Sequence, residues 1–128
     1  MNRLFLLLVA PILALIAAPT AALAHPKLVS STPAADATVA KPKAIKLTFS
    51  ETLVPQFSGF ELVMTGMPGM ASHDPMKIAG FKTSVASDGK TMVATLPRPL
   101  PAGQYELSWH AVAADTHRIE GKFSFTVK

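Results

Sequence analysis

Proline is the residue that most restricts how this chain can fold. Beyond residue 24, prolines separate the hydrophobic runs, at positions 33, 42, 55, 68, 75, 97, 99 and 101. Proline breaks helices and is tolerated in sheets only at edges and ends. No window between these positions carries a long pattern of helical period that is free of proline and glycine. The spacing therefore predicts short strands joined by turns.

The segments between the prolines alternate in the way that half-buried strands do. Ile45, Leu47 and Phe49 alternate with polar neighbours, and the turn sequence Ser87–Lys90 joins two β-rich runs into an expected hairpin. The other strands are expected near residues 27–31, 60–65, 78–85, 91–96, 104–110 and 119–127. About seven short strands predict an all-β domain, either a small antiparallel sandwich or a Greek-key barrel.

The first 24 residues have the anatomy of a secretory signal peptide. Arg3 gives a positive start, residues 4–18 are apolar, and small residues end in Ala-x-Ala at Ala24. A membrane anchor is the alternative, but the apolar run is shorter than the roughly 20 residues that a spanning helix needs. We expect cleavage after Ala24, leaving one β domain over residues 25–128 with no membrane span.

Charge and cysteine content exclude several classes of function. Without Arg3 the chain has 11 basic and 8 acidic residues, a net charge of +3, and the lysines are scattered. No basic run with interleaved aromatic residues occurs, so nucleic acid is not an expected partner. The sequence has no cysteine, so the domain has neither a disulfide nor a thiolate for metal binding or catalysis.

Cleavage after Ala24 would make His25 the amino-terminal residue. Its α-amine and imidazole Nδ1 can then chelate one metal ion, while Pro26, without an amide hydrogen, keeps the metal off the next backbone nitrogen. Asp115 and His117 are two residues apart, so in extended backbone both side chains point to the same side. This donor set suits tetragonal Cu(II), and zinc could use the same nitrogens. The alternative is a turn-capping Asp115 beside a solvated histidine.

Methionines gather in one short segment. Four of the six methionines lie within thirteen residues with one histidine among them: Met64, Met67, Met70, His73 and Met76. Methionine usually fills hydrophobic cores, but the glycines and prolines here forbid a helix that would give these side chains one face. Thioethers and an imidazole suit Cu(I), or Ag(I) by the same softness. Met64 also fits the end of a strand, and Met92 is expected in the core.

Taken together, these segments resemble the CopC family of periplasmic copper-resistance proteins. The shared stretches are HPKLVSSTPA at 25–34, FSETLVPQFSG at 49–59, the methionine-rich segment, and WHAVAADTH at 109–117. The resemblance covers essentially all of residues 25–128. It implies a Greek-key β-barrel of cupredoxin-like or immunoglobulin-like appearance.

The resemblance also implies two copper sites. Cu(II) would be held by His25, Asp115 and His117, and Cu(I) by Met64, Met67, Met70, His73 and Met76. Glu51 matches a position near the Cu(II) site, with a solvated acid at a strand end as the alternative. His110 stands where the family commonly has an arginine, and we expect it to support the site or lie on the surface.

The function expected from these residues is a periplasmic copper carrier for resistance and homeostasis, with copper as cargo. Expected partners are copper ions and an inner-membrane copper importer or another periplasmic copper protein. The expected state is a monomer, with a metal-linked dimer as the alternative. Two other functions are considered: a copper monooxygenase acting on polysaccharides through an amino-terminal histidine, and a metal-free immunoglobulin-like interaction domain. A carboxylate ligand and the lack of an aromatic sugar-binding surface count against the enzyme.

Overall fold

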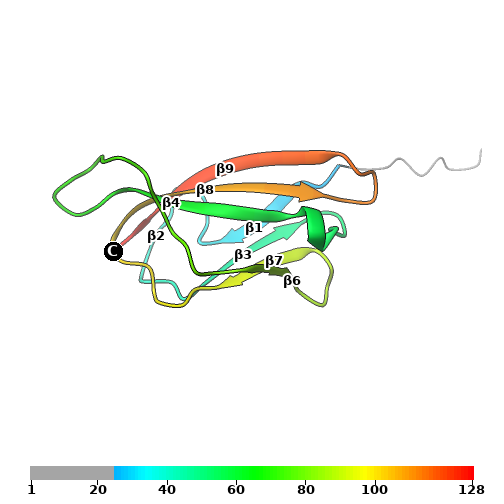
Figure 1. Cartoon of the computed structure of the whole chain (residues 1–128), viewed down its shortest axis with the longest axis horizontal. Helices are drawn as coiled ribbons and strands as arrows, with labels where there is room; N and C mark the ends of the chain where they lie inside the picture. The colour runs from blue at the N-terminus through cyan, green and yellow to red at the C-terminus, as the bar shows by residue number, and fades with distance from the viewer. Residues whose placement is uncertain (1–24) are drawn as a thin grey trace, which may run out of the picture.

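The computed structural model describes residues 25–128 as two β-sheets packed face to face (Figure 1). The expected signal peptide, 1–24, lies outside the described residues. One sheet has the order β1-β3-β7-β6 and the other β2-β9-β8-β4-β5. The strands of the first sheet are β1 (Leu28–Thr32), β3 (Ala44–Phe49), β6 (Thr83–Val85) and β7 (Thr91–Thr95). Those of the second are β2 (Thr38–Val39), β4 (Gly59–Gly66), β5 (Met76–Lys77), β8 (Gly103–Val112) and β9 (Arg118–Val127).

Nearly all strand pairs are antiparallel, and β2 alone pairs in parallel, with β9, among the described strands. The chain crosses between the sheets after β1, β2, β3, β5 and β7, as in Greek-key sandwiches. A 3-10 turn, Pro55–Phe57, lies on the crossing between β3 and β4. The expected all-β sandwich is confirmed.

The core fills the space between the two sheets. Its largest fully buried side chains are Ile45, Leu47, Phe49, Leu62, Met92, Tyr105, Leu107 and Phe125. Tyr105 stacks on Phe125 with 5.5 Å between ring centroids, and its hydroxyl donates a 2.7 Å hydrogen bond to the Pro101 carbonyl. Burial raises the pKa of Tyr105 to about 12. Met92 lies in the core, as predicted.

The seven expected strands correspond to β1, β3, β4, β6, β7, β8 and β9, but of the run expected at 78–85 only Thr83–Val85 forms a strand. The alternation in β8 places Tyr105 and Leu107 inward, whereas Trp109 on the same face is only half-buried. Its ring lies where a side chain at Gly121 would be, because a Cβ added there would meet the indole at 2.4 Å. The absence of a side chain at Gly121 therefore makes room for the indole of Trp109.

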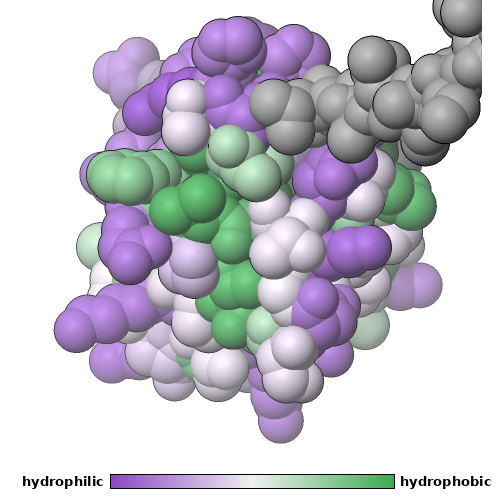
Figure 2. All heavy atoms as spheres, turned by 90° about the vertical axis from the view of Figure 1, so that its right-hand side faces the viewer, coloured by the Kyte–Doolittle hydropathy of each residue, from purple (hydrophilic) through white to green (hydrophobic). Residues whose placement is uncertain are grey.

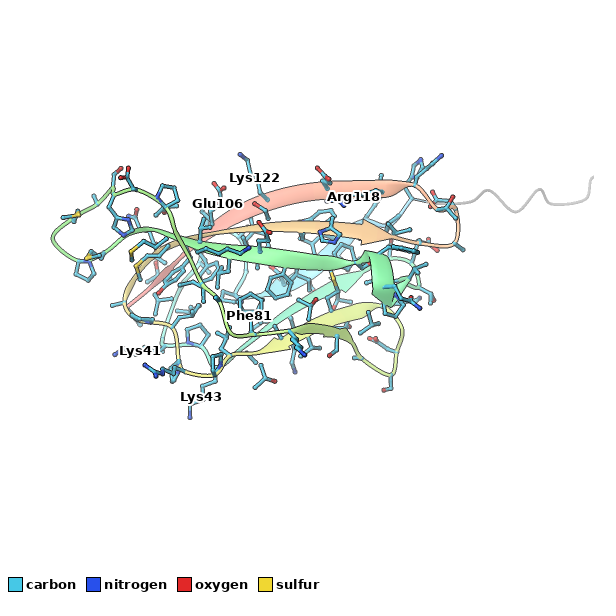
Figure 3. All side chains as sticks on the ribbon, in the orientation of Figure 1. Lys41, Lys43, Phe81, Glu106, Arg118 and Lys122 are labelled. Carbon is cyan, nitrogen blue, oxygen red and sulfur yellow. The ribbon has the colours of Figure 1, made fainter. Side chains whose placement is uncertain are left out.

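Charged side chains cover the outside of the sandwich. Glu106, Arg118 and Lys122 project from the β8–β9 side, whereas Lys41 and Lys43 lie at the opposite side, before β3 (Figure 3). Phe81 lies between the layers and stacks on Phe60 with 5.5 Å between ring centroids. No helix within residues 25–128 is long and apolar enough to span a membrane.

The two predicted clusters lie at opposite ends of the molecule. The connection between β4 and β5, with the methionines, projects beyond one end of the sandwich (Figure 1). His25 and the connection between β8 and β9 lie at the other end. Because the strands run the length of the molecule, the fold itself separates the two groups of residues.

Candidate metal sites

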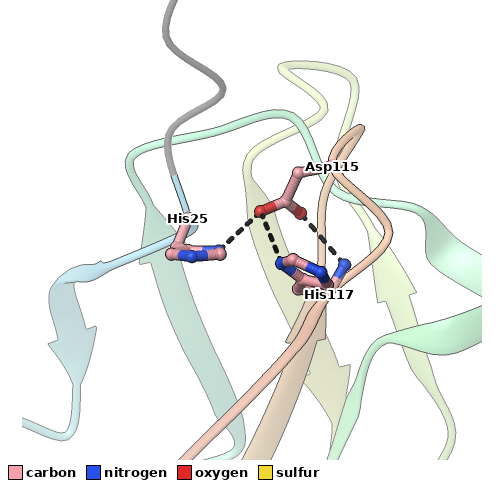
Figure 4. A group of neighbouring side chains, drawn as sticks. All are labelled: His25, Asp115 and His117. Carbon is pink, nitrogen blue, oxygen red and sulfur yellow. Dashed lines mark hydrogen bonds and ion pairs between the residues drawn. The ribbon is translucent and has the colours of Figure 1, made fainter.

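His25, Asp115 and His117, here called the histidine cluster, come together at one end of the sandwich (Figure 4). His25 precedes β1, and the other two residues lie in the connection between β8 and β9. One ligand atom from each residue lies within 4.8 Å of the others. Asp115 Oδ2 is 2.5 Å from His25 Nδ1 and 3.8 Å from His117 Nδ1. Among residues 25–128, this is the group of three whose geometry could hold a metal ion.

The backbone around Asp115 is a turn rather than the extended segment we expected. Thr116 has a left-handed φ of 63°, and its amide donates a 2.9 Å hydrogen bond to the Ala113 carbonyl. The amide of His117 donates to Asp115 Oδ1 at 3.2 Å. We expected extended backbone to place both side chains on the same side. That reason was wrong, because a turn separates the two residues. Asp115 caps the turn with one carboxylate oxygen, and this turn brings the imidazole of His117 toward the other.

The second oxygen of Asp115 faces the two imidazoles. The Asp115 side chain is 5% exposed, and its Oδ2 is buried without a well-directed hydrogen bond from any described residue. This oxygen has Nδ1 of His25 as its ion-pair partner, and a metal ion bound here would replace that contact. The imidazoles facing it are 54% and 72% exposed. An anionic oxygen at the base and two accessible imidazoles above it form a donor set that fits a divalent transition metal.

The segment that follows His25 is held firmly against the sandwich. The Pro26 ring is fully buried. The amide of Lys27 donates to Ser50 Oγ at 2.9 Å, and the amide of Ser50 donates to the Lys27 carbonyl at 2.9 Å. These contacts were not predicted, because a serine at the end of an alternating run gives no sequence signal for a partner in a distant segment.

Residues 64–76, here called the methionine loop, turn back on themselves as a hairpin. The amides and carbonyls of Met67 and Met70 exchange two backbone hydrogen bonds of 2.8 and 2.9 Å. Pro68 and Gly69 occupy the centre of this turn, and Gly69 has a φ of 80°, the conformation that a type II turn requires of its third residue. Met67 and Met70 are 38% and 51% exposed, so a soft metal can reach their sulfur atoms from solvent.

His73 lies on the return side of this hairpin and is hydrogen-bonded to Thr65 on the other side. Its amide donates to the Thr65 carbonyl at 3.0 Å. Its Nδ1 lies 2.7 Å from the Asp74 carbonyl, and a carbonyl only accepts, so Nδ1 carries the proton. In the neutral imidazole this leaves Nε2 as the acceptor nitrogen, and Nε2 is buried without a hydrogen-bond partner among the described residues. A metal ion binds an imidazole through an unprotonated ring nitrogen that has no other hydrogen-bond partner.

Met64 and Met76 occupy different environments although they pair directly across β4 and β5. Met76 is 48% exposed, whereas Met64 is 5% exposed and packs in the core. The structure therefore brings Met67, Met70 and Met76 to the surface of one loop. Met64 lies beneath them, where the strand pattern also placed it.

Glu51 and His110 do not belong to the histidine cluster. Glu51 makes no ion pair or side-chain hydrogen bond with a described residue. His110 lies on the outer face of β8, opposite Glu120, beside a hollow of about 410 Å³. Partial burial lowers the pKa of His110, and the charge of Arg118 lowers it further. His110 is thus on the surface, as expected.

Apolar residues accompany polar ones at the end of the molecule that bears the histidine cluster. In Figure 2, which faces this end, a hydrophobic strip crosses a largely hydrophilic surface. A hollow of about 670 Å³ lies here, lined by Val54, Gln56, Phe57, His110, Val112, Thr116 and Arg118. Phe57 is 63% exposed. Thr116 connects this hollow to the histidine cluster, because it stands between Asp115 and His117.

Comparison with protein families matches residues 28–128 to the CopC domain. Copper resistance protein C of Escherichia coli is 53% identical over 107 residues, covering 84% of each chain. Copper resistance protein C of Pseudomonas syringae pv. tomato is 55% identical over 105 residues, covering 82% of each.

Solved structures agree with this match. The crystal structure of PcoC from Escherichia coli, a copper resistance protein, has a TM-score of 0.74 at 52% identity. It covers 80% of this chain and 99% of that one. The crystal structure of CopC from Methylosinus trichosporium OB3b has a TM-score of 0.65 at 28% identity, covering 81% and 94%.

Proposed function

The chain belongs to the CopC family, and from this premise we propose that it is a periplasmic copper-binding protein that carries or sequesters copper. The relatives that share about half of its sequence are named for copper resistance. One related crystal structure is that of a copper resistance protein described as methionine rich. Copper is cargo in this proposal, so both sites take up and release the ion.

The histidine cluster is the proposed Cu(II) site, and one observation carries it. Asp115 Oδ2 is buried, lacks a well-directed hydrogen bond from the described residues, and faces Nδ1 of both His25 and His117. After cleavage at Ala24, the α-amine of His25 would add a second nitrogen from the same residue. Three nitrogens and one carboxylate oxygen favour tetragonal Cu(II), the divalent ion that such sites bind most tightly.

The methionine loop is the proposed Cu(I) site. Three exposed thioethers and the bare Nε2 of His73 lie on one hairpin, and soft sulfur ligands select Cu(I). The proposed ligands are Met67, Met70, Met76 and His73, with Met64 as the member that must move from the core to take part. Since the two sites lie at opposite ends, each oxidation state would be bound separately.

Export, domain organisation and partners belong to the same proposal. Residues 1–24 act as a cleaved signal peptide, and residues 25–128 form one copper-binding domain in the periplasm. The proposed protein partners are an inner-membrane copper importer or another periplasmic copper protein. The protein works as a monomer, since each proposed site draws its ligands from one chain.

A copper monooxygenase is the other function that an amino-terminal histidine could serve. The buried carboxylate of Asp115 argues against it, because this ligand takes a position that oxygen chemistry needs open. The half-buried Trp109 and buried Tyr105 offer no flat aromatic surface for a sugar.

The test uses protein that begins at His25, prepared without metal and titrated with Cu(II) in air and Cu(I) under anaerobic conditions. We expect one equivalent of each ion to bind, and both ions to bind together. Binding of neither would contradict the proposal and favour an interaction domain. Hydrogen peroxide formation in the presence of ascorbate and bound copper would favour the enzyme.

A further inference from the structure

The histidine cluster depends on a chain end that the fold must hold in place. Chain termini are ordinarily poorly ordered unless they are tied down. His25 lies outside β1, and its imidazole is 54% exposed, with Asp115 and the ring of His117 as its side-chain neighbours in the cluster. Its neighbours in the chain supply a further restraint: Pro26 is fully buried, and Lys27 forms two hydrogen bonds with Ser50.

Among the described residues, Ser50 supplies the side chain that hydrogen-bonds to the backbone just after His25. Its hydroxyl accepts the amide hydrogen of Lys27 at 2.9 Å, while its own amide donates to the Lys27 carbonyl at 2.9 Å. Lys27 is thereby clamped at both of its peptide groups. The backbone two residues away carries His25, whose imidazole faces Asp115 (Figure 4).

The same stretch of chain also holds the other half of the cluster. Leu53 forms an isolated bridge with Ala113, and the amide of Val54 donates to the Val112 carbonyl at 2.8 Å. The turn that contains Asp115 begins at Ala113. Residues 50–54 therefore fix the segment after His25 at one end and the segment before Asp115 at the other.

We propose that Ser50 is a positioning residue for Cu(II): its hydroxyl holds the amino-terminal segment so that His25 faces Asp115 before the metal arrives. The inference rests on the proposed function of the histidine cluster. Pre-ordering the ligands reduces the entropy lost when the metal binds. The Lys27 amide is exposed, so water replaces the hydroxyl when it is removed. Removal of the Ser50 hydroxyl should therefore disorder the metal site and change the free energy of unfolding little.

The test compares an isosteric pair, Ser50→Thr and Ser50→Val, with Ser50→Ala in protein that begins at His25. Threonine keeps the hydroxyl and valine replaces it with a methyl group of the same shape. Cu(II) dissociation constants are measured by competition with a chromophoric chelator, together with the dissociation rate and the melting temperature. Ser30→Ala is the matched control, since Ser30 lies exposed on β1 and its hydroxyl bonds to no described residue.

We expect Ser50→Val and Ser50→Ala to weaken Cu(II) binding by roughly three- to tenfold, the value of one hydrogen bond. The dissociation rate should rise, while Ser50→Thr and Ser30→Ala should match the wild type and Cu(I) binding should not change. In a His25→Ala background that also carries one additional amino-terminal residue, position 25 offers neither imidazole nor free α-amine, and removal of the hydroxyl should have no further effect on Cu(II).

Three results would overturn the positioning role: equal Cu(II) affinity in Ser50→Thr and Ser50→Val, an equal loss in Ser30→Ala, or a loss that persists without His25. An equal loss of Cu(I) and Cu(II) binding with a lower melting temperature would also overturn it, by assigning Ser50 to general stability. A wild type that binds no Cu(II) would instead refute the proposed function.

Discussion

Asp115 Oδ2 lies 2.5 Å from Nδ1 of His25, although one residue begins the described chain and the other lies near its end. The contact spans the two sheets, because His25 leads into β1 and Asp115 follows β8. The fold, and not a local motif, therefore builds this site.

Replacement of Asp115 by asparagine tests the carboxylate directly. Asparagine can still accept the His117 amide through Oδ1, so the turn should persist while the negative charge is lost. We expect Cu(II) affinity to fall by about tenfold or more, since contacts to charged groups are worth roughly 1.5–3 kcal/mol. Asp74→Asn is the control, because Asp74 is exposed and forms no ion pair with a described residue. An unchanged Cu(II) dissociation constant in Asp115→Asn would remove this residue from the site.

Replacement of Met67 and Met70 by leucine should abolish tight Cu(I) binding and leave Cu(II) binding intact. Leucine keeps the volume but has no sulfur, and both side chains are exposed, so stability should change little. Competition with a Cu(I)-specific chelator under anaerobic conditions measures the effect. Met92→Leu, in the core, should keep Cu(I) binding at a stability cost below about 1.5 kcal/mol. Equal loss of both oxidation states in the double variant would contradict two separate sites.

Met64→Leu resolves the role of the buried methionine. Because Met64 is 5% exposed, we expect this variant to weaken Cu(I) binding less than Met67→Leu or Met70→Leu does. A loss as large as theirs would mean that Met64 leaves the core to bind the ion.

Pro26→Ala tests why a proline follows the histidine. Alanine restores an amide hydrogen, and Cu(II) can displace that proton and bind the backbone nitrogen. We expect the visible absorption of the Cu(II) complex to shift to shorter wavelength as the pH rises from neutral to alkaline, whereas the wild-type spectrum stays constant. The same pH-independent spectrum in both proteins would show that Pro26 acts only through its buried ring.

Tyr105 gives a prediction for stability at alkaline pH. Its pKa is raised from 10.0 to about 12 by burial, so the folded protein favours the neutral phenol. This contribution is fully present below the unfolded pKa of about 10 and is lost as the pH rises towards the folded pKa.

Unfolding by urea at about pH 8 and about pH 11 therefore separates wild type from Tyr105→Phe. At the lower pH, loss of the hydrogen bond to Pro101 should destabilise the variant by about 1 kcal/mol. At the higher pH this difference should shrink, because the wild type alone loses stability by ionisation. A constant difference would contradict the assigned pKa.

Alternation of hydrophobic residues was enough to predict seven strands, since each of them packs one face on the core. It could not predict β2 or β5, because two residues carry no period. These two strands exist only through pairing with β9 and β4. The half-buried position of Trp109 could not be predicted for a related reason: alternation within β8 does not reveal that Gly121 is its neighbour in β9.

The candidate ligands were predicted from residue chemistry, but their arrangement required the fold. Donor types pointed to His25, Asp115 and His117, yet the turn at Thr116 that joins the last two depends on a left-handed backbone that the sequence does not mark. The tautomer of His73 follows from a carbonyl at its own neighbour, Asp74. The hydrogen bond between Ser50 and Lys27 could not be predicted, because the two residues are distant in the sequence.

The most direct test of the central claim is a Cu(II) titration followed by electron paramagnetic resonance. It compares protein that begins at His25 with the same protein carrying one additional amino-terminal residue. A free α-amine exists only in the first, so we predict a tetragonal, nitrogen-rich signal that changes and weakens in the extended protein. Identical spectra and affinities in the two proteins would contradict the account, because His25 would then be an ordinary histidine and cleavage would not create the site.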